Sequence, residues 1–354
     1  MKGMVICMNN LEYVLFLGFI GFLILLRRII DNKVTKILPY IALALFSGFR
    51  YNVGIDYNNY NKIYNVILEN NGFDIEYGYY LLTKAVIAIG GTQQLIFLIF
   101  ASATSYFLYK FINEFSRDKD LSLFMYCGFG PYYLSSFNGM REALAVLIFA
   151  YSLKYIKDKQ FGKFVAIMLL TSLIHQSAIL MIPMYFILST KLNIKALIIT
   201  FIVYYLGIYK TGLIHQLLKV VGYNKYNYYQ SLNMDNSYLI FLIIAVICYG
   251  IIMYIDKKEK IRSDIYIFIN MSLLSFLIVI AAYASPGISN IAFTRMNSYF
   301  FVSYIVLVPY IVGKFKQRIL IKSGVVSISV LYFLLVTAST TSLLPYMMSF
   351  KLFE

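Results

Sequence analysis

The sequence predicts an all-α, polytopic membrane protein with about twelve transmembrane helices, which form a single integral membrane domain over residues 1–354. Three observations point to this class. Only 13% of the residues are charged, against about 25% in an ordinary globular domain. Apolar runs of membrane-spanning length recur along the chain. Basic residues gather in short clusters between these runs, as in the cytoplasmic loops of membrane proteins. We therefore expect neither a soluble enzyme nor a separate soluble catalytic domain.

Each predicted spanning helix corresponds to one apolar run. In chain order, the runs cover residues 11–26, 37–49, 94–112, 121–137, 141–156, 162–174, 176–190, 195–209, 238–255, 264–283, 296–313 and 323–343. The first run lacks the basic leader and small-residue cleavage site of a signal peptide, so we expect a retained helix. Cys127 and Cys248 fall inside apolar runs, which argues against a disulfide framework or a thiolate metal site.

Lysines and arginines fix the predicted orientation. Most of the 31 basic residues lie in six clusters, at 27–36, 110–119, 154–163, 191–195, 257–262 and 314–322. The positive-inside rule places these clusters in the cytoplasm. Both termini then lie outside, as do two long polar loops at 50–93 and 210–237. The net charge of +15 thus encodes topology, and no nucleic-acid-binding motif accompanies it, so we expect no nucleic-acid partner.

The first outer loop contains two further helical segments. Residues 76–91 are apolar, but a thirteenth crossing there would invert every later orientation. The segment is short, carries Lys84 and ends in Gly90-Gly91. We therefore expect 76–91, together with 57–70, to form helices that lie along the outer membrane face. A re-entrant hairpin is the alternative for 76–91.

Three arginines stand out on the predicted outer side: Arg50, Arg141 and Arg295. Each abuts the outer end of an apolar run, in a chain where lysine outnumbers arginine 23 to 8. A guanidinium binds phosphate through two parallel hydrogen bonds, which a lysine cannot match. We therefore predict that these arginines bind a phosphorylated substrate. The alternative is that they snorkel to the membrane interface.

Depth within the membrane strengthens the case for two of them. Arg50 lies 14 residues beyond Lys36, and Arg141 lies 13 residues from Lys154, which sets both about 20 Å above the inner boundary. His175 lies at nearly the same height. The hydrocarbon layer is about 30 Å thick, so these groups would be recessed by about 10 Å. An ionisable group at that depth needs a partner and usually has a function.

Acidic and aromatic residues complete the set of candidates. Asp56 and Glu76 are the carboxylates placed to face a cavity at the membrane rim, where a carboxylate can accept a proton from a sugar hydroxyl. The tyrosines expected to stack on sugar rings are Tyr57, Tyr60 and Tyr79. The alternatives are a helix-capping role for Asp56 and an ordinary interfacial belt for the tyrosines. Glu142 is a further substrate-binding candidate, or else the ion-pair partner of the adjacent Arg141.

Four motifs resemble those of the EpsG family. They read Arg50-x5-Asp56-x3-Tyr60, Glu76-x-Gly78-Tyr79, Asn138-Gly-x-Arg141-x-x-Leu-Ala145 and His175-x-Ser177-Ala178. The motifs occur in the family's order, and the resemblance covers residues 36–310, with a looser pattern near Arg295. Family members are similar to the Wzy polymerases of O-antigen and exopolysaccharide loci. The resemblance also implies a glycosyltransferase-C-like architecture, with membrane-surface helices in the first outer loop.

The resemblance implies polymerisation of undecaprenyl-diphosphate-linked repeat units in a bacterial plasma (inner) membrane. A hydroxyl of one lipid-linked unit would attack the anomeric carbon of another and release undecaprenyl diphosphate. Arg141, Arg50 and Arg295 would stabilise this leaving group without a metal or cofactor. The base would be Asp56 or His175, and we favour Asp56, because its polar loop can reach a bulky glycan. Membrane lipid and a chain-length regulator protein are the other partners implied.

Three other functions are compatible with parts of this pattern. A glycosyltransferase that adds one sugar from a lipid monophosphate donor would use the same residues. A flippase or transporter of lipid-linked sugars usually shows internal repeats and broken helices in matching halves, and neither is evident here. A membrane acyltransferase would need no set of diphosphate-binding arginines. Two histidines, without paired acids at metal-ligand spacing, also predict that the chain builds no metal site.

Overall fold

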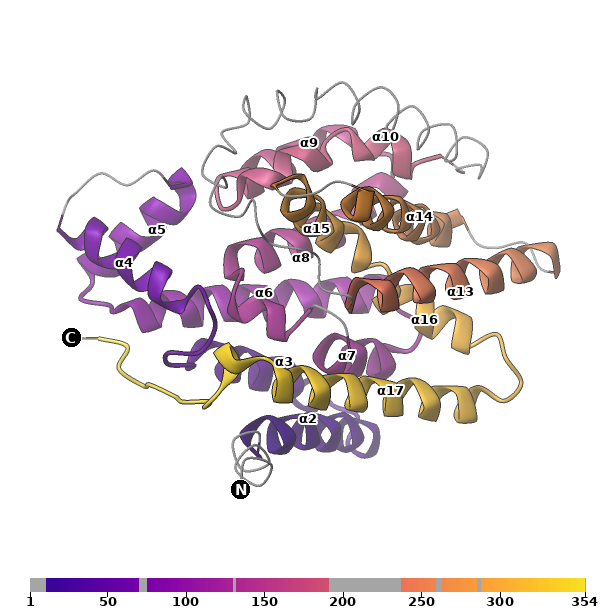
Figure 1. Cartoon of the computed structure of the whole chain (residues 1–354), viewed down its shortest axis with the longest axis horizontal. Coiled ribbons are helices and arrows are strands. Elements are labelled where there is room, and N and C mark those ends of the chain that lie inside the picture. Colours follow the sequence, from indigo (N-terminus) through magenta and orange to yellow (C-terminus); the bar gives the residue numbers. More distant parts are fainter. Residues whose placement is uncertain are drawn as a thin grey trace. The chain divides into compact units, whose positions relative to one another are not determined.

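The computed structural model describes residues 11–69, 75–129, 132–190, 237–258, 263–284 and 288–353 (Figure 1). Within these residues the regular structure is helical, and the only β-type pairing is two isolated bridges. The predicted all-helical class is therefore confirmed for the described part of the chain. The Cα positions group into two compact units, which are described separately.

Unit 1 comprises residues 1–154, 162–182 and 312–354. Its helices, some with a few residues outside these bounds, are α2 (Leu11–Ile29), α3 (Lys33–Gly48), α4 (Tyr57–Leu68), α5 (Tyr77–Ala88), α6 (Gln93–Phe115), α7 (Lys119–Gly128), α8 (Met140–Lys157), α9 (Phe161–Ser172) and α17 (Arg318–Ser339), with 3-10 helices η1 (Leu134–Phe137), η2 (Gln176–Met181) and η5 (Thr341–Leu343). Helix α3 packs along α6, and α7 contacts both α2 and α17. A Cβ atom at Gly48 would lie 2.9 Å from the Cα of Leu98, so this glycine allows the close approach of α3 to α6.

Unit 2 comprises residues 155–161 and 183–311. Its described helices are α10 (Met184–Leu188), α13 (Ser237–Lys258), α14 (Ser263–Ala284), α15 (Ile288–Phe301) and most of α16 (Tyr304–Val312). Helix α14 packs against α13, α15 and α10. Asn270 on α14 donates its side-chain N–H to the carbonyl oxygen of Thr190, and Ser275 pairs with Asn297 of α15 at 2.6 Å. Polar side chains thus connect helices whose faces are otherwise apolar.

Membrane-spanning character is supported by length and composition. Among the described residues, three segments are long and apolar enough to cross a bilayer: Gln93–Phe115, Arg295–Val312 and Arg318–Ser339. Shorter apolar helices accompany them, including Phe161–Ser172 and Asp264–Ile280. Helices α4 and α5 lie within the segments 57–70 and 76–91. The total of twelve crossings, and the position of α4 and α5 on the outer membrane face, stay predictions.

Some predicted spans are not continuous helices. The run 121–137 contains only the 10-residue α7, which rises about 15 Å, and the short η1. Helix α7 ends at Gly128, and Phe129 has extended backbone geometry; the pair Gly130-Pro131 follows in the sequence. The run 176–190 is divided into η2 and α10 at Pro183, and 296–313 changes from α15 to α16. The predicted span 195–209 and nearly all of loop 210–237 lie outside the described residues.

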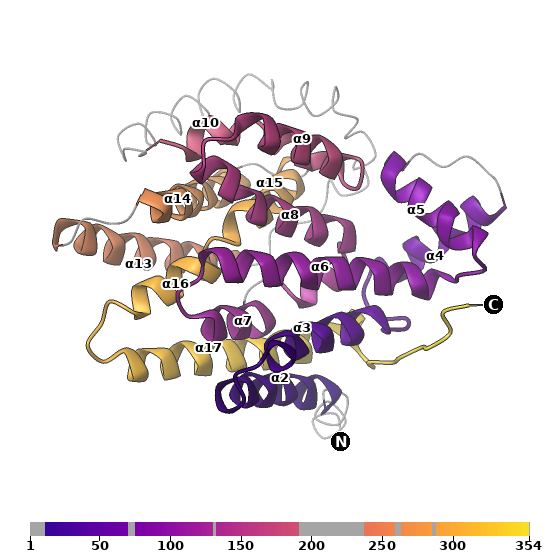
Figure 2. The same ribbon diagram turned by 180° about the vertical axis from the view of Figure 1, so that it is seen from behind.

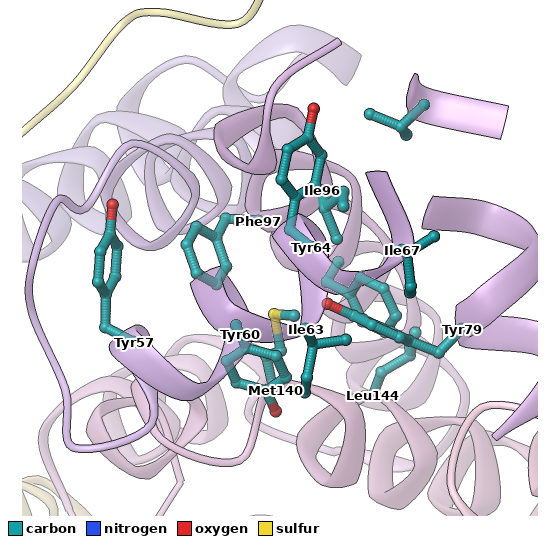
Figure 3. Close-up of a cluster of buried hydrophobic side chains, with 12 residues drawn as sticks. Tyr57, Tyr60, Ile63, Tyr64, Ile67, Tyr79, Ile96, Phe97, Met140 and Leu144 are labelled. Atoms are coloured by element: carbon teal, nitrogen blue, oxygen red, sulfur yellow. The ribbon is translucent and has the colours of Figure 1, made fainter. Parts of the chain in front are cut away.

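Tyrosines form much of the core between α4, α5, α6 and the start of α8 (Figure 3). Along α4 the buried residues recur at helical spacing: Tyr57, Tyr60, Ile63, Tyr64 and Ile67. The Tyr64 hydroxyl donates to the carbonyl of Gly91 at 2.8 Å, which satisfies its polar tip inside an apolar environment. This face fixes α4 against α6.

The segment after α17, residues 340–353, contains the short helix η5 and otherwise runs in an irregular path across the ends of α3 and α6, and we name it the C-terminal strap (Figure 2). Its backbone accepts hydrogen bonds from the N–H groups of Tyr51 and Thr92, both at 2.8 Å. Tyr346 stacks on Phe46, with ring centroids 4.1 Å apart. The strap therefore lies at the same end of unit 1 as residues 50–56. The side of the membrane on which this end lies stays a prediction.

Candidate functional site

A partly buried carboxylate lies between two basic side chains where the start of α5, the start of α8 and the turn after α9 meet. Glu76 immediately precedes α5, Arg141 lies in the first turn of α8, and His175 precedes η2. Arg141 Nη1 donates a hydrogen bond to Glu76 Oε2. His175 Nδ1 lies 3.4 Å from Glu76 Oε1. The three side chains are 14–19% exposed, and we name them the Glu76 cluster.

Gly78 explains how α5 comes close enough to form this cluster. Its N–H donates to the carbonyl oxygen of Leu173 at 2.8 Å. A Cβ atom at this position would lie only 2.7 Å from the same oxygen, so a side chain would separate the two segments. Leu173 lies two residues before His175. The spacing Glu76-x-Gly78 therefore places the carboxylate of Glu76 in the same turn as the close backbone contact between Gly78 and Leu173.

The electrostatics of the cluster favour an ionised carboxylate. Burial alone would raise the pKa of Glu76, but the contact with His175 and the charge of Arg141 outweigh it and lower the pKa to about 2. His175 Nδ1 is buried, and it has no hydrogen-bond partner of good geometry among the described residues. A carboxylate facing Nδ1 favours the proton on that nitrogen, which leaves Nε2 as the proton acceptor.

Arg141 lies over two buried tyrosine rings. Its guanidinium carbon is 5.2 Å from the ring centroid of Tyr79 and 5.8 Å from that of Tyr60. Such contacts stabilise a cation through the negative face of the ring. Tyr57, Tyr60 and Tyr79 are each less than 8% exposed, so they line the protein core in this structure (Figure 3). Their predicted stacking on sugar rings stays a prediction.

Arg50 is enclosed separately from the Glu76 cluster. It is 1% exposed and donates hydrogen bonds to the carbonyl oxygens of Ser47 at 2.5 Å and Phe137 at 3.3 Å. Its guanidinium carbon lies 4.4 Å from the ring centroid of Phe97. Within the described residues no carboxylate forms an ion pair with Arg50. Carbonyl oxygens and aromatic rings thus surround the charge that the sequence assigned to substrate binding.

Asp56 is half-buried at the first position before α4. Its side chain makes no capping hydrogen bond, so the capping alternative is wrong, and Oδ1 instead accepts from Asn59 Nδ2 at 3.2 Å. The preceding residues attach to the start of α8: the Ile55 N–H donates to Asn138 Oδ1 at 2.7 Å. Gly54 has φ +99°, and a Cβ there would lie 2.7 Å from the Phe137 carbonyl oxygen. The Asp56 segment and the Asn138-Gly139 motif therefore lie side by side.

The remaining candidates are Glu142 and Arg295. Glu142 is partly exposed on α8, beside Arg141, whose hydrogen-bonded ion pair is with Glu76. Arg295 is partly exposed on α15 of unit 2, and its role stays a prediction. Among the described residues, no group of three or more His, Cys, Asp or Glu side chains is arranged to hold a metal ion.

Comparison with known proteins gives one match. The sequence model of the EpsG family matches residues 33–348, nearly the whole chain. No curated protein and no solved structure matches. The matched region includes every residue of the Glu76 cluster, together with Arg50, Asp56 and Arg295.

Proposed function

The chain belongs to the EpsG family, whose members are Wzy-like polymerases, and from this premise we propose that it polymerises undecaprenyl-diphosphate-linked oligosaccharide repeat units. The product would be a surface polysaccharide: an O-antigen, a capsule or an exopolysaccharide. The observation that supports this proposal is the Glu76 cluster, in which one carboxylate contacts both an arginine and a histidine. A diphosphate leaving group needs such a cation, and an attacking hydroxyl needs such a base.

The reaction exchanges one carbon–oxygen bond for another. The hydroxyl oxygen of one lipid-linked unit bonds to the anomeric carbon of a second unit. The bond between that carbon and the diphosphate oxygen breaks, and its electron pair leaves with undecaprenyl diphosphate. The proton of the attacking hydroxyl passes to a base of the protein. The growing glycan thereby moves from one lipid to the other.

Arg141 is the residue best suited to the leaving group. Its contacts with Glu76, Tyr60 and Tyr79 hold the guanidinium before substrate arrives, so little reorganisation is needed when charge develops. Arginine has five N–H donors, and Nη1 uses one of them on Glu76. Nε has no hydrogen-bond partner among the described residues. The donors that remain could meet two phosphate oxygens in a bidentate arrangement.

His175 is the better-supported base. Glu76 faces Nδ1 and, as in other carboxylate–histidine pairs, would orient the ring so that Nε2 can accept a proton. The sequence favoured Asp56 because of its polar loop, yet Asp56 has no comparable neighbour: its described side-chain contact is with Asn59. We therefore assign proton removal to His175 and leave Asp56 to contact the glycan.

The decisive experiment replaces Arg141 by lysine, in a deletion strain complemented with the variant gene. Lysine keeps the charge but loses the bidentate fork, so we expect polymer to fall by about a hundredfold or more, at unchanged protein level. Single-repeat lipid-linked units should accumulate, as measured by gel electrophoresis of the polysaccharide and mass spectrometry of the lipids. Arg28→Lys is the matched control, because Arg28 also forms an ion pair, with Asp120 at 2.5 Å, away from the cluster.

The same assay separates the competing functions. Full polymer from Arg141→Lys would contradict the diphosphate role of this arginine. Lipid-linked units retained on the inner leaflet of the deletion strain would indicate a flippase, since a polymerase mutant leaves them at the outer face. Units that lack one terminal sugar would indicate a glycosyltransferase that adds a single residue.

A further inference from the structure

An apolar pocket of about 260 Å³ opens between α6, α8 and the end of α9, within unit 1. Its walls come from Phe107 of α6, Ile148 and Tyr151 of α8, and Leu170 and Ile174 at the end of α9. Leu170 is 65% exposed at its mouth, so the pocket is open at the protein surface. We name it the α6–α8–α9 pocket.

Three residues that line this pocket carry a hydroxyl group: Tyr151, Ser152 and Thr171. The Tyr151 hydroxyl accepts a hydrogen bond from Lys154 Nζ at 2.6 Å, and the other two hydroxyl groups donate within their own helices. Ser152 Oγ donates to the carbonyl oxygen of Phe149 at 2.7 Å, and Thr171 Oγ1 donates to that of Ile167 at 2.7 Å. Both bonds are local bonds inside a helix. Ligand pockets usually contain a few polar groups that orient the ligand. This pocket has no such donor in Ser152 or Thr171, which fits a hydrocarbon chain.

The pocket is linked to the Glu76 cluster through residues that neighbour both. Ile174 lines the pocket and directly precedes His175. Ile148 and Ile174 also pack against the tyrosine-rich core, which contains the two rings beneath Arg141. Ile148 follows Arg141 by seven residues on α8, a rise of about 10 Å. A ligand with its charged group at Arg141 could therefore place its apolar part in the pocket.

Resting on the proposed function, we propose that the α6–α8–α9 pocket binds part of the isoprenoid chain of the lipid-linked substrate. The diphosphate would lie at Arg141, and the chain would follow α8 away from it into the pocket. Whole-ligand pockets usually measure roughly 300–1,000 Å³. At about 260 Å³ the pocket takes a section of the chain, and the rest extends past Leu170 into the surrounding lipid.

The experiment uses the absence of tryptophan from this sequence. Leu170→Trp and Leu169→Trp each create a protein with a single tryptophan. Both leucines are exposed, at 65% and 47%, so neither substitution should disturb the core. Leu170 lines the pocket and Leu169 does not, which makes Leu169→Trp the matched control.

Each protein is reconstituted into nanodiscs of phosphatidylcholine with brominated acyl chains, which quench tryptophan fluorescence on contact. Unbrominated undecaprenyl diphosphate is then added. We expect fluorescence to recover at least twofold more in Leu170→Trp than in Leu169→Trp, because the isoprenoid displaces phospholipid only from the pocket. Undecaprenol, which lacks the diphosphate, should need about tenfold or higher concentration for the same recovery, since it cannot pair with Arg141.

Equal recovery in both proteins, or none in either, would overturn the proposal and leave the pocket to phospholipid chains. Equal potency of undecaprenol would separate the pocket from Arg141 and overturn the proposal as well. Neither measurement requires catalysis. The pocket proposal can thus fail while Arg141→Lys still blocks polymer, and a flippase could pass this test while failing the polymer assay.

Discussion

Glu76 contacts two groups of different chemistry, so one substitution there should affect both. In the folded protein its pKa is about 2, against an ordinary value of 4.5. A carboxylate with a depressed pKa stabilises the fold above the unfolded value, and this contribution is lost as the pH falls through the folded value. The difference corresponds to roughly 3 kcal/mol at neutral pH. The pH window of the loss is therefore about 4.5 down to 2.

We predict that Glu76→Gln lowers the thermal midpoint at pH 7 and removes part of the wild-type loss between pH 4.5 and pH 2. The measurement is thermal unfolding in detergent across this range. Glu12→Gln is the control, because Glu12 lies exposed on α2, away from the cluster. If the thermal midpoints of wild type and Glu76→Gln depend on pH in the same way, ionisation of Glu76 does not cause the loss of stability at low pH.

The base is tested by a pair of substitutions. We predict that His175→Gln keeps donor binding but loses turnover by about a hundredfold or more, because an amide cannot accept the proton. Asp56→Asn should be only partly impaired. Donor binding is followed with labelled lipid-linked unit, and turnover by polymer length on gels. The reverse pattern would restore Asp56 as the base, and similar residual polymer from both variants would mean that neither residue removes the proton.

Sequence reasoning at the residue scale identified the members of the cluster but not their pairing. Arg141 and His175 were placed at similar depth from their distances to cytoplasmic lysines, and the structure brings them together at Glu76. The pairing with Glu76 depends on a contact across 65 residues, which no local pattern encodes. Arg50 illustrates the opposite case. Its depth in the membrane stays a prediction, and its contact with the carbonyl oxygen of Phe137 depends on a segment 87 residues away in the chain.

At the scale of elements, the position of α5 depends on one glycine. We predict that Gly78→Ala abolishes polymer although Glu76, Arg141 and His175 are unchanged. The added Cβ would lie 2.7 Å from the carbonyl oxygen of Leu173 and must move α5 away from the turn that carries His175. Loss of the close contact should also cost about 1–3 kcal/mol of stability, measured by thermal unfolding.

Gly162→Ala is the matched control for this substitution, because a Cβ atom at Gly162 would meet nothing within 4 Å. It lies in α9, one of the helices that build the site. Normal polymer from Gly78→Ala would show that the close approach of α5 is not required. Loss of polymer from both variants would indicate a general sensitivity of the fold.

The orientation of α5 is open to direct labelling. Lys84 is exposed on this helix, and the positive-inside rule predicts that it lies on the outer side. We expect Lys84→Cys, in a background with the native cysteines replaced, to react with a membrane-impermeant maleimide added to intact spheroplasts. Lys314→Cys, from a cytoplasmic cluster, should react only after permeabilisation. Labelling of position 84 solely after permeabilisation would overturn the predicted topology.

Element prediction succeeded for α6 and missed the break at Pro183, although a proline does not always end a helix here, since Pro39 lies inside α3. Helix α6 spans 93–115, close to the predicted 94–112. The run 176–190 is just as apolar, but Pro183 divides it, and hydropathy alone does not register such a break. The run 121–137 was likewise read as one helix across the pair Gly130-Pro131.

For the molecule as a whole, the helical class followed from the apolar runs of membrane-spanning length together with the low share of charged residues. The C-terminal strap gave no comparable signal. Residues 340–353 are apolar without helical or strand periodicity, so nothing local predicts their path. Their position follows from tertiary contacts, chiefly those of Tyr346 with Phe46 and of Tyr13 with Leu343.

Because the C-terminal strap pairs with Arg50, part of the surroundings of this residue is made late in protein synthesis. The hydrogen bond from the Tyr346 hydroxyl to the Phe46 carbonyl joins residues 300 positions apart. Arg50 leaves the ribosome early, whereas the backbone at Met348 that pairs with it is among the last described residues to emerge. The backbone of Arg50 can therefore form this pairing only after the helices between residues 50 and 348 have been made. Contacts so distant in sequence close slowly. A nascent chain that stalled or was cut before residue 340 would contain most of its helices. It would lack the strap that pairs with Arg50, so the segment beside Asp56 would be incompletely packed.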